Sequence, residues 1–347
     1  MHCFVRLDFY TFKIMSTADQ LHETVMGCLS EVKSDCHEVQ QKALQTLVSI
    51  TKVSPQNRSL LAQTDGAIST LLDLCKSSSS SSSNVIQALS LSILFNLSLN
   101  PDLKRSLAEM GTIYLLNSMI QSPTSPESCK LLASSMICSL AMLDKNKAKF
   151  GAAGTIPLLV ESVSKKPSGR PPPPAAAHHH HHHLLSSLAE LVQFHGNCTL
   201  AVRSGAVPVL LQLVVGSSDD GGEDLAGTSL AILNLLARFD EGLIALRSTD
   251  QIVSSMVDVL KGRSMFSKEG AAEILLRLFD ESEGCMRDAS RLPEFSTVLA
   301  DLQLRGSARA REKASQLMKK MMETNFDSYL SLETPCLTDG SIDNFIM

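Results

Sequence analysis

The sequence predicts an all-α fold, a right-handed α-solenoid (superhelix) of about six to seven short helical repeats. Three observations support this prediction: a Gly-centred phrase that recurs along the chain, long apolar helices that follow it, and insertions that keep one phase of the repeat. The composition agrees, because 44% of the residues are hydrophobic and only 4% are aromatic, with no Trp. Cores of Leu, Val, Ile, Ala and Met suit stacked helices better than sheets.

The recurring phrase is clearest at Ala201–Val215, AVRSGAVPVLLQLVV. It predicts the end of one helix, a left-handed turn at Gly205 and a new helix with Pro208 in its first turn, where the missing N–H of proline is harmless. The spacing of successive turns, 43 to 51 residues, is close to the period of helical solenoids, about 40–47 residues. The predicted turn residues are Gly66, Gly111, Gly154, Gly205 and, in a degenerate copy, Thr249.

Each repeat is predicted to hold a short first helix, a second helix with a Leu-Leu pair and a longer third helix. The third helices are apolar on most faces, so they must be buried on most faces, by their own repeat and by both neighbours. They are predicted at Val85–Leu97, Cys129–Met142, Leu184–Phe194, Leu225–Ala237 and Lys268–Phe279.

Polar insertions of variable length separate the predicted second and third helices. Their shared phase puts them on one edge of the solenoid, where loop length is tolerated. They are Ser77–Ser83, Ser122–Ser128, Ser164–His183, Gly216–Asp224 and Gly262–Ser267. The predicted organisation is a poorly ordered segment over residues 1–19, the solenoid over 20–323 with its long low-complexity loop at 164–183, and a tail over 324–347.

The composition also limits the function. A net charge of -5 gives no general attraction to nucleic acid or membrane, and no run of about 18 apolar residues predicts a membrane span. The nine Cys are scattered without a CxxC pair, which fits a reducing compartment. We therefore expect a cytoplasmic and/or nuclear protein.

These phrases resemble armadillo repeats, and more specifically the repeats that follow the U-box in plant ubiquitin ligases and occur in plant armadillo-only relatives. The resemblance is carried by Lys42–Leu74, by Ala88–Ile113 and by the ending GSARAREKA at Gly306–Ala314, and it covers about residues 20–323. We expect no U-box in this chain, because too few residues precede Leu21 to hold one, and so no surface for a ubiquitin-conjugating enzyme.

The resemblance implies a concave groove in which an Asn near the end of each third helix binds the backbone of an extended peptide. Asn96 and Asn234 match that Asn, while Ser139, Glu190 and Arg277 stand at the corresponding places. Bonding of both Asn side chains within the repeats is an equally open alternative. Import receptors of this family also place Trp beside the Asn residues, and this chain has none, which argues against an import receptor.

Other motifs have structural alternatives. His178–His183 offers imidazoles for a transition metal, but we favour a native low-complexity loop without a metal site. Ser122 and Ser125 each precede a Pro and fit proline-directed phosphorylation, or simply an unmodified linker. The acidic loop at Asp219–Asp224 lacks the spacing of a calcium loop. The basic ending, Arg305–Lys320, has no aromatic residues for base stacking, so nucleic acid is not an expected partner.

No nucleophile, phosphate-loop or metalloprotease motif occurs in the sequence. We therefore predict a non-catalytic scaffold or adaptor that binds protein partners in the groove of the third helices, with no cofactor and no small-molecule substrate. The first alternative is a substrate-recognition component in ubiquitination, related to plant U-box ligases. The second is DNA binding through the basic C-terminal helix, which would show a steep salt dependence.

Overall fold

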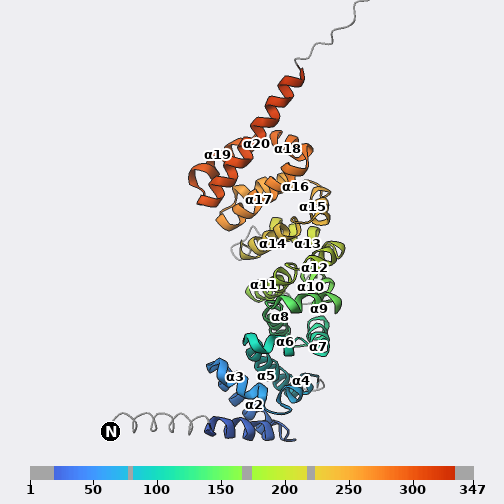
Figure 1. Ribbon diagram of the computed structural model, residues 1–347, viewed down its shortest axis with the longest axis vertical. Coiled ribbons are helices and arrows are strands. Elements are labelled where there is room, and N and C mark those ends of the chain that lie inside the picture. The colour runs from blue at the N-terminus through green and yellow to red at the C-terminus, as the bar shows by residue number, and fades with distance from the viewer. Residues whose placement is uncertain (1–18, 77–80, 166–173, 217–222, 333–347) are drawn as a thin grey trace, which may run out of the picture. The chain divides into compact units, whose positions relative to one another are not determined.

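The computed structural model describes residues 19–76, 81–165, 174–216 and 223–332 (Figure 1). These residues are almost entirely helical and include no strand, which confirms the all-α prediction. Contacts divide the chain into unit 1, Met1–Gly242, and unit 2, Leu243–Met347, and each unit is described by itself. The number of repeats and the handedness of the superhelix remain predictions.

The helices follow the predicted order of a short first, a second and a longer third helix, after an opening helix at residues 19–31 and α2 (His37–Val53). The first helices are α3 (Pro55–Gln63), η1 (Pro101–Leu103) with α6 (Lys104–Leu107), α9 (Asp144–Ala152), α12 (His195–Arg203), α15 (Asp240–Arg247) and α18 (Glu283–Ser290). The second helices are α4 (Ala67–Lys76), α7 (Met110–Gln121), α10 (Thr155–Ser164), α13 (Ala206–Gly216), α16 (Ile252–Lys261) and α19 (Phe295–Arg305). The third helices are α5 (Ser81–Ser98), α8 (Glu127–Ala141), α11 (Pro174–Leu191), α14 (Glu223–Leu236), α17 (Met265–Glu281) and α20 (Ala308–Leu332).

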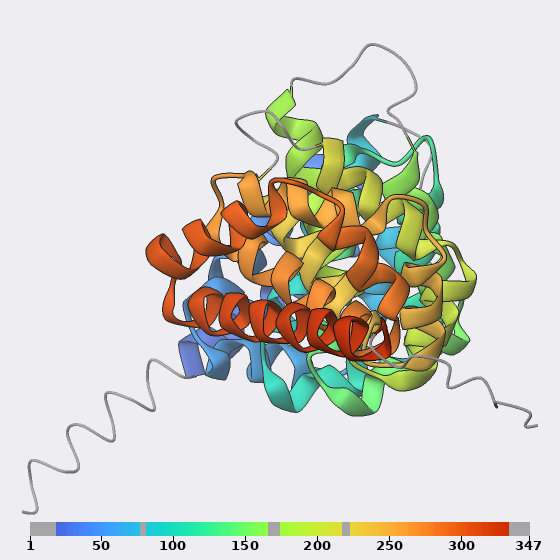
Figure 2. The same cartoon turned by 90° about the horizontal axis from the view of Figure 1, so that it is seen from above.

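In unit 1 the third helices form a continuous layer. Helices α2, α5, α8, α11 and α14 pack side by side in sequence order, and α4, α7, α10 and α13 cover them from one side (Figures 1 and 2). Leu94 of α5, Ile137 of α8 and Leu233 of α14 are at most 1% exposed. Each third helix is therefore covered by neighbouring helices on several sides, which is why it is apolar on most faces, as the sequence predicts.

In unit 2, α17 and α20 pack against each other, with α16 against α17 and α19 against α20. Beyond apolar contacts, α17 and α20 are joined by polar pairs: Glu273 with Lys313, Asp280 with Lys320, and Ser307 donating to Glu269. Helix α20 is amphipathic, and Ala310, Ala314 and Leu317 on one of its faces are fully buried.

The predicted left-handed turns are confirmed at Gly66, Gly154 and Gly205, whose φ angles are 75°, 75° and 78°. Two turn predictions are wrong. Gly111 lies inside α7, which begins one residue earlier at Met110 after an extended Glu109. In the degenerate copy the left-handed residue is Gln251, with φ 59°, and not Thr249, which the sequence-based alignment used.

Two predicted boundaries also differ from the structure. Helix α11 begins at Pro174, so the six His residues belong to this helix and not to the loop predicted over 164–183. Pro suits the first turn of a helix, and the three Ala residues that follow, at 175–177, have the highest helix propensity. Helix α20 continues to Leu332, past the predicted start of the tail at 324. The predicted disorder of residues 1–18 concerns residues outside those described.

Candidate functional site

Asn96, the first residue of the predicted binding strip, is bonded within the stack. Its amide nitrogen Nδ2 donates to Thr51 Oγ1 at 3.0 Å and to the carbonyl oxygen of Val48 at 3.5 Å, both on α2. The side chain is 5% exposed. It therefore joins α5 to the neighbouring helix α2, which is the alternative that the sequence left open.

Ser139, the second residue of the strip, is also buried. Its hydroxyl donates to the carbonyl oxygen of Ser98 at 2.9 Å, which links α8 to the end of α5. Lys104 Nζ donates to the hydroxyl and the carbonyl oxygen of Ser139. Burial lowers the pKa of the Lys104 ammonium, against the raising effects of Cys138 and Glu190. This contact places a buried cation at the end of α8.

Glu190, near the end of α11, is half-buried and accepts a hydrogen bond from Gln193 Nε2 at 3.3 Å. Its carboxylate also lies 3.9 Å from Lys147 Nζ. Lys147 belongs to the first helix α9, and its side chain is 4% exposed. It donates to Gln193 Oε1 at 2.9 Å and pairs with Asp144 at 2.7 Å. Lys147 therefore fixes the side chains that follow α11.

Asn234 and Arg277, the last two residues of the strip, lie in different units. Asn234 Nδ2 donates to the carbonyl oxygen of Leu230, one turn earlier in α14, at 3.0 Å. Arg277 lies in unit 2 and pairs with Glu273 at 3.0 Å. Hydrogen bonding by Lys313 holds the pKa of Glu273 below its usual value, although burial opposes this. The partner-binding role of all five residues remains a prediction.

A repeated asparagine contact shows which residues of successive repeats correspond, and it does so more directly than the Gly turns. Asn146 and Asn197 each donate from Nδ2 to a carbonyl oxygen six residues earlier, at Leu140 and Leu191. Gly242 takes this place in the next repeat, where a Cβ atom would come within 2.1 Å of the carbonyl oxygen of Leu236. In this register, Ser139 and Glu190 correspond to Leu235, and Asn234 lies one position away.

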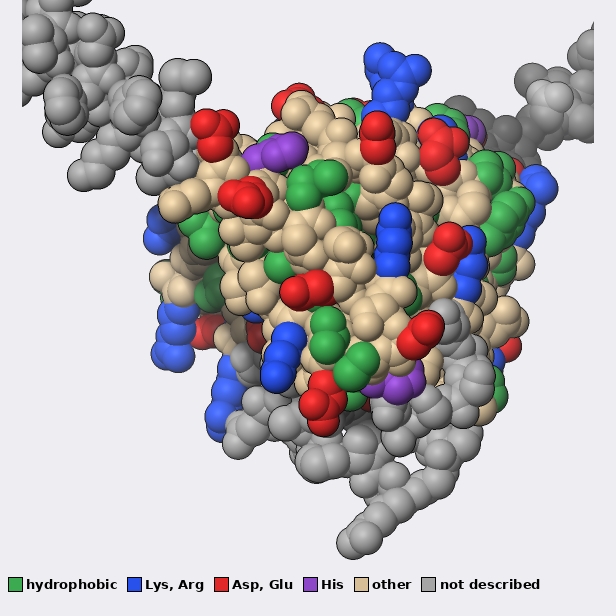
Figure 3. Space-filling model, turned by 90° about the horizontal axis from the view of Figure 1, so that it is seen from below, with side chains coloured by type: hydrophobic (Ala, Val, Ile, Leu, Met, Phe, Trp, Pro, Cys, Tyr) green, Lys and Arg blue, Asp and Glu red, His purple; other side chains and the backbone are tan. Residues whose placement is uncertain are grey.

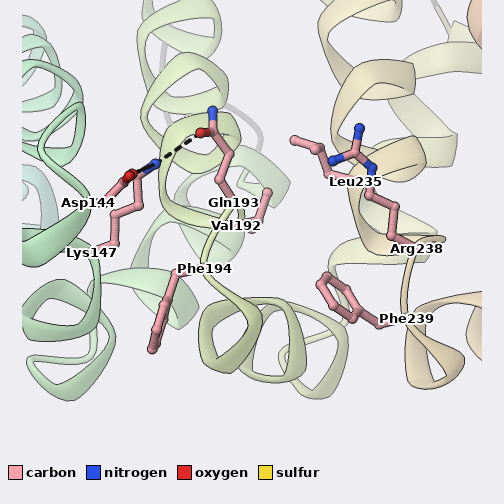
Figure 4. A pocket seen from close by; sticks show the side chains of 8 residues that line it. All are labelled: Asp144, Lys147, Val192, Gln193, Phe194, Leu235, Arg238 and Phe239. Carbon is pink, nitrogen blue, oxygen red and sulfur yellow. Dashed lines mark hydrogen bonds and ion pairs between the residues drawn. The ribbon is translucent and has the colours of Figure 1, made fainter.

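A pocket of about 680 Å³ opens in unit 1 where α11 and α14 end. In Figure 4 the two Phe rings lie on one side of it, and the Lys147–Gln193 hydrogen bond and Arg238 lie on the other. The lining residues are Asp144, Lys147, Val192, Gln193, Phe194, Leu235, Arg238 and Phe239. None of them belongs to the predicted strip. They could have been found from the sequence only by aligning the residues that follow each third helix, QF at 193–194 with RF at 238–239.

The family model for the plant U-box protein ARM repeat region matches residues 24–338. The chain belongs to this family. The match confirms the resemblance, and it assigns nearly the whole chain to the repeat region of such proteins.

Two curated relatives support the assignment. This chain is 27% identical over 224 residues to U-box domain-containing protein 8 of Arabidopsis thaliana. It is 32% identical over 124 residues to U-box domain-containing protein 1 of Medicago truncatula. The matches cover 65% and 34% of this chain, and 54% and 17% of the relatives. The matched region is thus little more than half of one relative and a small part of the other.

Solved structures confirm the armadillo solenoid. A designed armadillo repeat protein is similar with a TM-score of 0.60 at 18% identity, over 74% of this chain and 99% of that one. Another designed armadillo repeat protein, solved in complex with the peptide (KR)4, has a TM-score of 0.59 at 14% identity, over 73% and 99% of the two chains. At these identities the likeness shows the fold alone.

The structure also shows the surroundings of the predicted phosphorylation sites and of the His run. Ser122 follows α7, and its hydroxyl lies 3.0 Å from that of Thr124, while Ser125 is half-buried; their phosphorylation remains a prediction. In the His run, His183 Nδ1 lies 3.1 Å from Ser135 Oγ of α8. Among the residues that the structure describes, no group of His, Cys, Asp and Glu is placed to hold a metal ion.

The buried thiols act as small apolar side chains. Burial raises the pKa of Cys75 to about 12 and those of Cys138 and Cys198 to about 11. These thiols are therefore protonated at neutral pH and weakly nucleophilic. Cys75 and Cys198 are among the buried residues of the core.

Opposite charges are paired on the C-terminal helices. Several cations of the C-terminal helices have carboxylate partners, as in Arg305 with Asp301 at 3.2 Å and Lys320 with Asp280. Figure 3 shows acidic, basic and apolar side chains interspersed on the face seen from below. Within the described residues no single helix has the length and apolarity to cross a membrane, although α12 and α13, bent by 76°, pass this test as a pair.

Proposed function

We propose that this chain is a non-catalytic scaffold that binds a segment of a protein partner along the third-helix face of unit 1, the surface where α5, α8, α11 and α14 end. The observation that carries the proposal is that three neighbouring third helices are each followed, within three residues, by a large exposed apolar side chain. Leu99, Met142 and Phe194 are 44%, 64% and 43% exposed. Exposed apolar area gathered where neighbouring helices end is the kind of surface that protein partners cover.

The five predicted residues have distinct parts in this proposal. Glu190 presents a carboxylate at the surface, beside Gln193 and the pocket. Asn96 and Ser139 act indirectly, because their bonds to α2 and to Ser98 hold the ends of neighbouring third helices together. Asn234 contributes from α14, whereas Arg277 belongs to unit 2 and is not part of this face.

Affinity capture with the purified chain, followed by mass spectrometry, tests the proposal. Glu190→Lys should change the set of captured partners without unfolding the chain, since Lys147 keeps Asp144 and Gln193 as its partners. Glu161→Lys is the matched control: Glu161 lies on the second helix α10 in an exposed pair with Lys165, and such pairs contribute about 0–1 kcal/mol. Identical capture by wild type and Glu190→Lys would contradict a role for this face.

Family membership favours one alternative, a substrate-recognition component in ubiquitination. In that case the captured proteins would be ubiquitinated in cells only when this chain is present. Incubation of the purified chain with ubiquitin, an activating enzyme and a conjugating enzyme distinguishes a ligase from a non-catalytic adaptor. Ubiquitin transfer by the chain itself would contradict the non-catalytic proposal, whereas its absence, together with partner capture, supports an adaptor.

A further inference from the structure

The pocket at the ends of α11 and α14 has the size of a recognition site. Its volume of about 680 Å³ lies within the range of ligand-binding clefts, about 300–1,000 Å³. It is formed entirely by residues of unit 1. This space can take more than one side chain of a bound segment.

Each aromatic ring of the pocket packs against a neighbouring residue. The ring of Phe194 lies over Gly196, where a Cβ atom would be only 3.0 Å from Phe194 Cε1. The ring of Phe239 packs edge-on against His195, with the ring centroids 4.5 Å apart. Rigid aromatic side chains lose little entropy on binding, which is why they dominate the energetics of many interfaces.

The polar wall includes a cation that has no carboxylate partner within the described residues. Lys147 is buried and already bonded to Asp144 and Gln193. Arg238 is exposed and makes no ion pair within the described part of the chain. Lys147 is the partner of Asp144 and lies near Glu190, which leaves Arg238 as the lining cation without a carboxylate partner among the described residues. The pocket therefore complements an anionic group beside an apolar one.

We infer that this pocket anchors an extended segment of the partner that carries a bulky apolar side chain next to an Asp or Glu. The apolar side chain packs between Phe194 and Phe239 on Val192 and Leu235, and the carboxylate pairs with Arg238. This inference rests on the proposed function and names the chemistry of the partner. It differs from the basic peptide (KR)4 bound by the designed armadillo protein.

Fluorescence anisotropy with three labelled peptides tests the inference on the full chain. The first peptide has one Phe flanked by Glu in a Gly/Ser frame, the second replaces Glu with Lys, and the third replaces Phe with Ala. Wild type should bind the first at least about tenfold more tightly than the other two, since a buried aromatic anchor and a matched charge each contribute on this scale. Equal binding of all three would overturn the inference.

Variants locate the binding. Arg238→Glu should reverse the charge preference, so that the Lys peptide binds about tenfold more tightly than the Glu peptide. Phe194→Ala should weaken both peptides with Phe and leave the Ala peptide unchanged. Arg105→Glu changes an exposed Arg on α6, outside the pocket, and is the matched control. Unchanged preferences in Arg238→Glu would show that the peptide binds elsewhere and would contradict the inference.

The outcome is separable from that of the proposed function. If Glu190→Lys changes partner capture while Arg238→Glu and Phe194→Ala do not, the scaffold role stands and the pocket inference fails. If none of these variants changes capture, both fail. Self-association that Arg238→Glu abolishes, without peptide binding, would replace the partner segment by a second copy of the chain and overturn the inference.

Discussion

Asn197 is predicted to stabilise unit 1 through a single side chain that joins three helices. It starts in α12, and its Nδ2 donates to the carbonyl oxygens of Lys147 in α9 and Leu191 in α11 at 3.0 and 2.9 Å. Its side chain is 1% exposed. Ala cannot donate to either carbonyl, and water cannot easily replace the amide at a buried site.

The size of the effect follows from the number of bonds. Each buried hydrogen bond contributes about 1 kcal/mol net, so Asn197→Ala should lower the free energy of unfolding of unit 1 by about 2 kcal/mol. Asn57 is the matched control, since it makes a single bond of this kind, to the carbonyl oxygen of Ile50 at 2.9 Å, and is half-buried. Asn57→Ala should cost about 1 kcal/mol.

Urea denaturation followed by circular dichroism measures both variants. Asn197→Asp adds a second test, because an ionised carboxylate donates no hydrogen bond and faces two carbonyl oxygens. It should be less stable than Asn197→Ala at neutral pH and recover as the pH falls toward about 4, where the protonated acid donates one bond. A cost for Asn197→Ala no larger than that for Asn57→Ala would refute the reasoning.

Two further predictions concern backbone and charge. Gly205→Ala should lower the free energy of unfolding by about 1 kcal/mol, because φ at this position is 78°. Gly111→Ala should be neutral or stabilising, because Gly111 is helical and no atom would contact the added Cβ. The urea midpoints of the two variants check this, and equal effects would contradict the turn assignment. In unit 2, Lys313 depresses the pKa of Glu273 below its ordinary 4.5, so the pair stabilises above that pH and the stabilisation is lost as the pH falls through the lower, folded-state pKa. Glu273→Gln should make the melting temperature less dependent on pH in the acidic range. An unchanged pH dependence in this variant would contradict the pairing.

The repeat architecture could be predicted from the sequence because it depends on periodic signals. The apolar third helices and the Gly turns at Gly66, Gly154 and Gly205 recur at a nearly constant interval, and each has a local physical cause. The errors occurred where that local cause was missing. Gln251 takes the left-handed conformation without being Gly, and the sequence phrase around Gly111 is unchanged although α7 starts before it.

The candidate site was harder to predict because it depends on contacts between repeats. The sequence alone does not distinguish an Asn near the end of α5 that binds a peptide from one that bonds to Thr51 of α2. In the structure, Asn96 bonds to Thr51. The pocket lies after the third helices, where no periodic pattern points to it. Phe194 and Phe239 become neighbours only because α11 and α14 pack side by side.

The central claim is that a partner binds unit 1 along the surface where the third helices end. Hydrogen–deuterium exchange of the full chain, with and without a captured partner, tests this most directly. The account predicts slower exchange at the ends of α8, α11 and α14 and at the start of α12, with α10 and α13 unchanged. Protection confined to α10 and α13, on the covering layer of second helices, would contradict it.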